Sequence, residues 1–444
     1  MATPLLSGPL RRAVVRVAWP AAAGQLLVFL NNFVDFQWVT LLGRPAAAGL
    51  TSGMTLFWVL TALGQVFSIG LAAVVARRLG EGCGEEAGRA AAAGLKGALL
   101  ASVAVGVAGW LLVPHLVQVG QGSLEAKANA RDYLLPLFAG APALFLFYAA
   151  EGVFRGHGET RRPLRALAIA LGLNIALDPL LIFGLGLGVF GAGLATAISL
   201  GLTGLLLARA ALRTEFVKFA EFRRRELDWA VVARIVRIGM PVSLHGIVFS
   251  LVYLVLIDET SRAGGDAATA ALGLGIRFEG VSYMASVGCA AAAAAVVGQC
   301  LGAGLLLRAR DAAWTAARLG MGISFLWGLL MYLLPESAVG LMTGGDAMVN
   351  AHTLDYFRIV GVSLAFMALE IVLEGAFSGA GNTIPPMLLG SSITVARIPL
   401  AILMARGLGW GVAGVFWTIN FTCVARGLIF ALWFARGRWI RGAA

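Results

Sequence analysis

Long apolar runs alternate with short polar segments along the whole chain. Most runs reach or exceed the roughly 20 residues that an α-helix needs to cross a bilayer. They are continuous, whereas the strands of a transmembrane barrel alternate apolar and polar residues. The pattern predicts an all-α integral membrane protein with twelve transmembrane helices, at about 13–42, 47–76, 89–113, 132–154, 164–185, 189–212, 231–260, 267–300, 311–334, 353–378, 384–405 and 411–435.

The longest polar insertion separates two sets of six predicted helices. It spans residues 213–230 and contains Arg223-Arg224-Arg225. We therefore expect an N-lobe over 1–212, a cytoplasmic linker over 213–230 and a C-lobe over 231–444. Arginines concentrate at the two ends and in alternate connections, and the positive-inside rule places such segments in the cytoplasm. Both termini of this multi-pass protein are expected on the cytoplasmic side of the inner, or plasma, membrane.

The two halves of the chain resemble each other. VVARRLGEG at 74–82 matches VVGQCLGAG at 296–304, and EGVFRGHGETRRP at 151–163 matches EGAFSGAGNTIPP at 374–386. GLGVFGAG at 186–193 matches GLGWGVAG at 407–414, and Trp19-Pro20 matches Met240-Pro241. All offsets lie between 221 and 223 residues. Six spans return the chain to its starting side, so the halves form two parallel repeats with pseudo-twofold symmetry, which is typical of secondary transporters.

Composition supports a membrane protein. Of 444 residues, 59% are hydrophobic and 13% are charged, whereas soluble domains carry about a quarter charged residues. Mean hydropathy is +0.86. The net charge of +11 comes from arginines between apolar runs and forms no groove-sized patch, so we expect the lipid bilayer and no nucleic acid as partner. We expect a monomer.

Acidic and amide side chains interrupt two apolar runs of the first half. Asn174 and Asp178, in GLNIALDPLLIF, are four residues apart and share one helical face. Asn31 and Asp35 repeat this spacing in the first helix. Acids inside a membrane are costly and usually carry protons, ions or substrate. Two acids in one lobe could share a proton, and the alternative is a structural aspartate that bonds a neighbouring helix.

Two further residues of the first half complete this set. Thr196 offers a hydroxyl one span after Asp178, and its alternative role is a hydrogen bond to its own helix. Pro20 lies inside the first helix and should kink it. The kink predicts a hinge, and the alternative is a static bend.

The repeat shows that these acids belong to one half. At offsets of 221 and 220, the residues Asp35, Asn174 and Asp178 align with Leu256, Thr394 and Ile398. A structural role common to both lobes would not predict this asymmetry. The asymmetry favours a proton-coupling site in the first lobe.

The second half offers candidates for substrate contact. Aromatic, methionine and acidic side chains could line an adaptable pocket, namely Phe278, Glu279, Tyr283, Met284, Met367 and Glu370. At helical spacing the same residues also suit a core or lipid-facing position.

The sequence contains no catalytic or metal-binding pattern. P-loop, HExxH and GxSxG motifs are absent, and the four cysteines lack the spacing of metal ligands. We therefore expect a protein that is not an enzyme, with neither a cofactor nor a metal. Transport would then draw its energy from an ion gradient.

Several segments resemble the multidrug and toxic compound extrusion (MATE) family over essentially the whole chain. They are VARRLGEG after helix 2, VVGQCLGAG after helix 8 and VDFQWV in helix 1. Within the family, the N-lobe pattern of the DNA-damage-inducible (DinF-like) branch is similar to that of Pro20, Asn31, Asp35, Asn174, Asp178 and Thr196. The resemblance implies that the proline bends helix 1 and that the aspartates and asparagines form a protonation network. The sodium-dependent branch has a glutamate in helix 7, which SLHGIVFSLVYLVLI lacks.

The resulting hypothesis is a proton-coupled antiporter that exports amphipathic or cationic organic compounds by alternating access. Sodium stays open as a coupling ion at the N-lobe acids. The alternative is a flippase of the same superfamily for a lipid-linked oligosaccharide. A flippase would favour a strongly basic cavity, which Arg277, Arg358 and Arg397 could supply.

Overall fold

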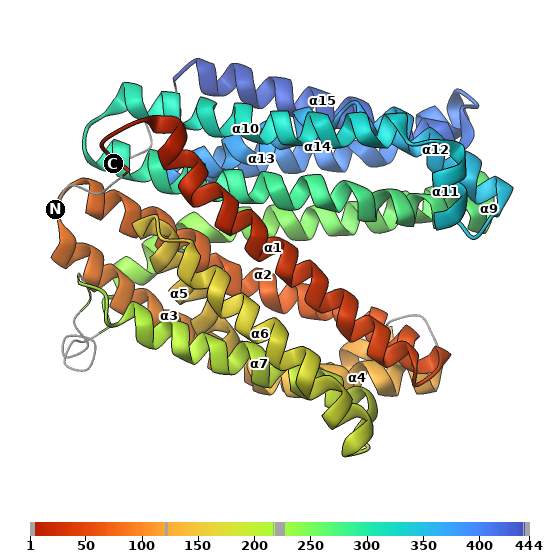
Figure 1. Ribbon diagram of the computed structural model, residues 1–444, viewed down its shortest axis with the longest axis horizontal. Helices are drawn as coiled ribbons and strands as arrows, with labels where there is room; N and C mark the ends of the chain where they lie inside the picture. The colour runs from red at the N-terminus through yellow and green to blue at the C-terminus, as the bar shows by residue number, and fades with distance from the viewer. Residues whose placement is uncertain (1–4, 120–122, 216, 218–226, 438, 440–444) are drawn as a thin grey trace. The chain divides into compact units, whose positions relative to one another are not determined.

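The computed structural model describes residues 5–119, 123–215, 217, 227–437 and 439, and the regular structure in this part of the chain is helical (Figure 1). The first half contains α1 (Leu10–Thr40), α2 (Arg44–Gly80), α3 (Gly84–Val119), α4 (Leu124–Ala139), α5 (Ala141–His157), α6 (Arg161–Pro179), the π-helical turn η1 (Leu180–Gly184) and α7 (Gly188–Ala211). The second half contains α9 (Trp229–Gly302), α10 (Leu306–Leu333), α11 (Glu336–Met342), α12 (Ala347–Gly361), α13 (Leu364–Gly379), α14 (Ile384–Ile402), η2 (Leu403–Gly407) and α15 (Gly411–Ala435). Much of the predicted linker 213–230, with its arginine run 223–225, lies outside the described residues.

The described helices account for twelve membrane spans. Nine are long and apolar enough to cross a bilayer singly. The pairs α4–α5 and α12–α13 each pass this test as one span, bent by 59° and 52°. α9 joins two helices, because Gly265 (φ 65°, ψ −157°) is not helical. Counting α9 as two spans confirms the twelve-helix prediction.

The bend between α4 and α5 follows from two prolines around Gly140. Pro136 and Pro142 lack the backbone N–H that a continuous helix would use, and their rings crowd the preceding turn. The span also begins earlier than the predicted residue 132. Ser123 caps the start of α4 by accepting a hydrogen bond from the Ala126 amide at 3.2 Å. The polar residues of the first turns therefore belong to the helix.

The two halves repeat the same local irregularities. The π-helical turns η1 and η2 follow α6 and α14, and each of these helices has 19 residues. Gly186 and Gly188 after η1 have positive φ angles of 66° and 55°, and Gly409 and Gly411 after η2 have 73° and 56°. Only glycine adopts such angles without strain. The internal repeat seen in the sequence is therefore also a repeat of backbone conformation.

This backbone match corrects one part of the sequence alignment. α6 and α14 begin after Thr160 and Thr383, so their register is 223 residues and not 220. In this register the counterpart of Asn174 is Arg397 instead of Thr394, and the counterpart of Asp178 is Ala401 instead of Ile398. The second half still lacks an acid at the position of Asp178.

The chain divides into two compact units. One is built mainly from Ala23–Ser243 and Gly298–Gly304, and the other mainly from Ser7–Ala22, Leu244–Val297 and Leu305–Ala444. The lobe limits expected from the sequence stay a prediction.

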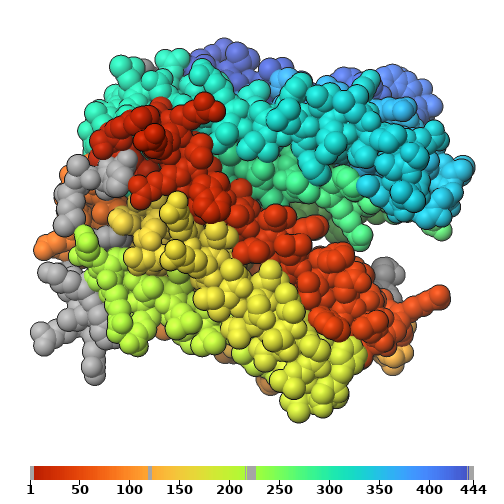
Figure 2. All heavy atoms as spheres, in the orientation of Figure 1, coloured from red at the N-terminus to blue at the C-terminus, as the bar shows by residue number. Residues whose placement is uncertain are grey.

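Each unit has an apolar core and an apolar outer surface. The core of the first unit includes Leu50, Leu71 and Phe145, and that of the second includes Val360 and Phe416. Large apolar side chains also lie exposed on α6, which is yellow on the visible face of Figure 2, namely Ile169 (51%) and Ile175 (42%), and at the start of η1, where Leu180 is 54% exposed. In a spanning helix such side chains face lipid.

The close contact between α2 and α5 depends on Gly152. A Cβ atom at this position would lie 2.5 Å from the Ser68 carbonyl oxygen. We expect Gly152→Val to destabilise the protein by about 1–3 kcal/mol, as overpacking does, and thermal unfolding in detergent measures the change. Gly172→Val is the control, since a Cβ at Gly172 meets no atom within 4 Å. Equal unfolding temperatures for the two variants would contradict the prediction.

Candidate functional site

Polar side chains from three helices meet inside the first unit. α1 supplies Asp35, α6 supplies Asn174 and α7 supplies Thr196, and all three are buried. The Thr196 hydroxyl donates to Asp35 Oδ2 at 3.1 Å, and Asn174 Nδ2 donates to Thr196 Oγ1 at 3.4 Å. Asn31 Nδ2 lies 3.4 Å from both carboxylate oxygens of Asp35. The structure thus links four of the predicted coupling residues in one hydrogen-bonded chain.

Asp178 lies beside this chain and is fully buried. Neither of its carboxylate oxygens has a hydrogen-bond partner among the described residues. Its carboxyl group is close enough to that of Asp35 for the two to interact by charge and by hydrogen bonding. Two ionised carboxylates have no proton to donate, so one proton on either residue would supply the missing donor. The geometry suits a shared proton, and the coupling role of these residues stays a prediction.

Thr196 has two acceptors for one proton. Besides Asp35, the carbonyl oxygen of Ala192 in the same helix lies 3.1 Å from its hydroxyl oxygen. A hydroxyl group donates one hydrogen bond at a time. Both roles considered from the sequence, a bond to the acid and a bond within the helix, are therefore geometrically available. Which one forms depends on whether Asp35 needs a donor.

Tyr133 of α4 belongs to the same site, and sequence reasoning missed it. It is fully buried, it interacts with the Asp35 and Asp178 carboxyl groups, and its ring packs edge-on against Phe57 at 6.5 Å between centroids. Its hydroxyl has no hydrogen-bond partner by distance and angle among the described residues. The residue directly follows Asp132, where the fourth helix was expected to begin. Tyr133 lies inside the predicted helix 132–154, but a single tyrosine in an apolar run, unlike an acid, carries no signal of its own.

Pro20 is buried within α1, which runs from Leu10 to Thr40. Its missing N–H leaves the Arg16 carbonyl without its usual helical partner. The division between the two compact units falls between Ala22 and Ala23, shortly after Pro20. A hinge at Pro20 stays a prediction.

In the second unit, the candidate pocket residues lie in different surroundings. The Phe278 ring contacts Trp327 and Phe357, at centroid distances of 6.3 and 4.9 Å. Glu279 accepts a hydrogen bond from the Tyr356 hydroxyl at 2.7 Å. The other candidates are core, half-buried or exposed: Met367 (7% exposed), Met284 (half-buried) and Tyr283 (43% exposed). A pocket formed by these residues stays a prediction.

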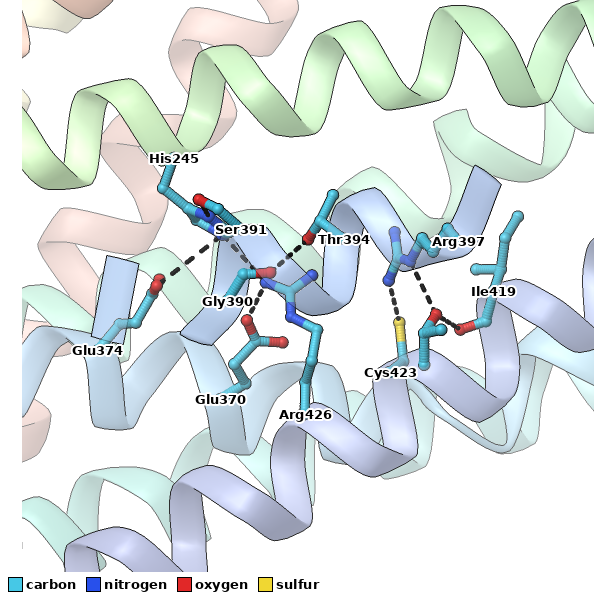
Figure 3. Close-up of polar contacts among 11 residues, drawn as sticks. His245, Glu370, Glu374, Gly390, Ser391, Thr394, Arg397, Ile419, Cys423 and Arg426 are labelled. Atoms are coloured by element: carbon cyan, nitrogen blue, oxygen red, sulfur yellow. Dashed lines mark hydrogen bonds and ion pairs between the residues drawn. The ribbon is translucent and has the colours of Figure 1, made fainter. Parts of the chain in front are cut away.

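Glu370 takes part in a buried polar cluster that the sequence did not reveal (Figure 3). It forms an ion pair with Arg426, and both side chains are buried. Arg426 Nη2 also lies 3.0 Å from His245 Nε2, while His245 Nδ1 lies 3.0 Å from the Ser391 hydroxyl. Since a guanidinium only donates, Nε2 accepts and Nδ1 carries the ring proton. His245 is therefore neutral in this arrangement.

The ligand atoms of His245, Glu370 and Glu374 lie within 4.8 Å of one another, a spacing that could suit a metal ion. However, Arg426 already places a positive charge among them through its contacts with Glu370 and His245. A metal ion would have to displace this guanidinium. The residues therefore fit a built-in cation better than a metal.

Arg397 of α14 is a second buried arginine in this unit, with different partners. Its Nε donates to Thr422 Oγ1 at 2.7 Å and its Nη2 donates to Cys423 Sγ at 3.1 Å. Its Nη1 has no hydrogen-bond partner among the described residues. The sequence grouped it with Arg277 and Arg358, but both of these are exposed whereas Arg397 is 0% exposed. The three arginines therefore do not share a buried site.

Comparisons with known proteins identify the family. The MatE profile matches residues 20–180 and 241–403, one stretch in each half. A protein named "Probable multidrug resistance protein NorM" from Pseudomonas aeruginosa is 31% identical, with 95% of this chain and 88% of that protein covered. Another of the same name from Thermotoga maritima is 26% identical, with 98% and 94% covered.

A solved structure described as "Crystal structure of MATE in the straight conformation" has a TM-score of 0.91 and 26% identity, with 98% of this chain and 97% of that chain covered. The profile match, the relatives and the fold agree over nearly the whole chain. The protein belongs to the multidrug and toxic compound extrusion (MATE) family of membrane transporters.

Proposed function

We propose that this transporter exports amphipathic, often cationic, organic compounds from the cytoplasm in exchange for protons. The names of the relatives support multidrug efflux. The pairing of Asp35 with Asp178 carries the proposal of proton coupling, because Asp178 is fully buried and none of the described residues donates a hydrogen bond to it. The protein would act as a monomer in the plasma membrane with both termini in the cytoplasm, in agreement with its arginine distribution.

Protonation can act as a switch because it changes both the charge of the site and the number of its hydrogen-bond donors. With both acids ionised, Asp35 holds the Thr196 hydroxyl and Asn31, while like charges repel within an apolar interior. One proton removes a charge and adds a donor, and Thr196 can then turn to the Ala192 carbonyl. A ligand shifts a conformational equilibrium only through different affinities for the two states. The proton meets that condition if the outward-open and inward-open states arrange these groups differently.

In the proposed cycle, Asp35 and Asp178 take a proton from outside in the outward-open state. Neutralisation lets α1 bend at Pro20, and the bend expels the bound compound. Alternating access then releases the proton to the cytoplasm. Sodium is the competing coupling ion, because carboxylate, amide and hydroxyl oxygens are hard ligands.

The flippase alternative is less well supported. It requires a concentrated positive charge for a pyrophosphate, but Arg277 and Arg358 are exposed and Arg426 is neutralised by Glu370. Arg397 alone does not provide such a cavity.

The direct test of the proposed function compares ion gradients. We expect purified protein in proteoliposomes to transport rhodamine 123, a cationic dye, at a rate that rises with the proton gradient at fixed sodium concentration. A proton uncoupler should abolish the gradient-driven part. Transport that instead follows a sodium gradient at fixed pH would reject proton coupling.

The carboxyl pair should be required for this coupling. We expect Asp35→Asn and Asp178→Asn each to reduce proton-driven dye transport by at least about tenfold, because the amide cannot exchange a proton at neutral pH. Asp258→Asn is the control, since Asp258 is largely exposed in a surface ion pair with Arg262. Transport is measured at equal protein per vesicle. Wild-type rates in both site variants would contradict the assignment.

The hinge hypothesis gives a separate prediction. If bending at Pro20 is part of the cycle, Pro20→Ala restores a helical hydrogen bond to Arg16 and should slow turnover several-fold with nearly unchanged dye affinity. Pro241→Ala is the matched control in the second repeat. Unchanged turnover of Pro20→Ala would show that the bend is static.

A further inference from the structure

The second unit contains a buried positive charge that lacks an anionic partner. No carboxylate of the described residues lies within 4.0 Å of the Arg397 guanidinium, the limit for an ion pair. The Nη1 atom of Arg397 has no hydrogen-bond partner among these residues either. Its two hydrogen bonds go to neutral groups of Thr422 and Cys423. Arg426, by contrast, is paired with Glu370. A buried charge is costly unless an opposite charge and hydrogen bonds compensate it.

The nearest acids are already engaged. Glu279 accepts the Tyr356 hydroxyl, and Glu370 binds Arg426. Both influence Arg397 through charge, but at more than ion-pair distance. Figure 3 shows one nitrogen of the Arg397 guanidinium pointing away from Cys423. This side of the guanidinium is free to bind another group.

The surroundings of Arg397 favour a planar ligand. The guanidinium carbon lies 5.6 Å from the centre of the Phe249 ring and 5.8 Å from that of Tyr253. These two rings are themselves only 4.6 Å apart and tilted by 34°. Phe249 is half-buried, so rotation of its side chain would open a path to the guanidinium. Arginine binds carboxylate and phosphate through parallel N–H donors and also stacks on aromatic faces.

The position of Arg397 indicates a transport role. It lies near the middle of the span Ile384–Gly407, and substrates of secondary transporters bind near the membrane midplane. A lipid headgroup stays at the interface and would not reach this depth. In the other half, the corresponding position is Asn174 of the acidic site. Equivalent positions of the two repeats thus hold opposite chemistry.

We propose that Arg397 is a binding residue for the carboxylate or phosphate of an aromatic organic anion or zwitterion carried by this transporter. Nη1 donates to the anionic group, while Thr422 and Cys423 hold the other side of the guanidinium in place. The substrate ring takes a place against Phe249 and Tyr253. The inference rests on the proposed export function and extends its substrates beyond cations.

The test uses two dyes with the same xanthene ring system, fluorescein, which is anionic at pH 8, and rhodamine 123, which is cationic. Fluorescence anisotropy measures their binding to the purified full-length protein and to Arg397→Gln, Arg397→Lys and Arg358→Gln. We expect Arg397→Gln to weaken fluorescein binding by about tenfold or more, as loss of a charge-assisted hydrogen bond does. Arg397→Lys should weaken fluorescein binding less than Arg397→Gln does, since lysine keeps the positive charge. Rhodamine 123 binding should not weaken in either variant, and Arg358→Gln should match the wild type for both dyes.

The outcomes separate this inference from the proposed function. Absent fluorescein binding by the wild type, unchanged binding by Arg397→Gln, or an equal loss of both dyes in Arg397→Gln and Arg397→Lys would overturn the inference. If Arg397→Gln does not fold, a weaker fluorescein affinity in folded Arg397→Lys at unchanged rhodamine affinity supports it. Thermal stabilisation by inorganic phosphate alone, without fluorescein binding, would show a site for small inorganic anions and also overturn it. Rhodamine 123 transport in proteoliposomes tests the export function independently.

Discussion

The carboxyl groups of Asp35 and Asp178 lie together inside one unit with too few donors to satisfy them. An apolar interior screens like charges poorly, and a buried polar group without a hydrogen bond is costly. The surrounding side chains must therefore supply the hydrogen bonds that stabilise this pair. Asn31 and Thr196 donate hydrogen bonds to Asp35, whereas no described residue donates one to Asp178. The proposed proton coupling depends on this imbalance.

In the second unit, a buried acid is compensated by the positive charge of an arginine side chain. Arg426 neutralises Glu370 and contacts His245, which gives a compact, ion-paired cluster. Such a cluster gains little by taking up another ion. Arg397 is the exception, because its hydrogen-bond partners among the described residues are neutral. The unit is thus closed to cations at one point and suited to an anion at another.

The repeat explains how one fold holds both kinds of site. Both halves use the same sequence of a 19-residue helix, a π-helical turn and a glycine-rich connection. Identical backbone places residue 174 in one half and residue 397 in the other at equivalent positions. The asparagine there donates to Thr196, which in turn donates to Asp35, whereas the arginine there brings a charge of its own. The backbone is shared, and side-chain chemistry distinguishes the halves.

The sequence alone determined the class of the protein and the order of its spans. Continuous apolar runs of bilayer length indicate spanning helices, because the strands of a barrel alternate apolar and polar residues. The repeated motifs, six spans apart, indicate parallel halves. It also singled out Asp35 and Asp178, because isolated acids stand out in apolar runs. It could not determine the start of α4 at Leu124, since polar residues in the first turns of a helix resemble a loop. Tyr133 was missed because a single tyrosine inside an apolar run does not stand out as an acid does.

Partners from distant segments were likewise beyond the sequence. The contacts of Thr196 with Asp35 and of Arg426 with Glu370 join residues 161 and 56 positions apart. Local periodicity reports which face of a helix is polar, but it does not report which other helix that face meets. Only the packing of α1, α6 and α7 shows that the acids lie together. Only the packing around α14 shows that no described residue gives Arg397 an anionic partner, because a missing partner is a property of three-dimensional surroundings.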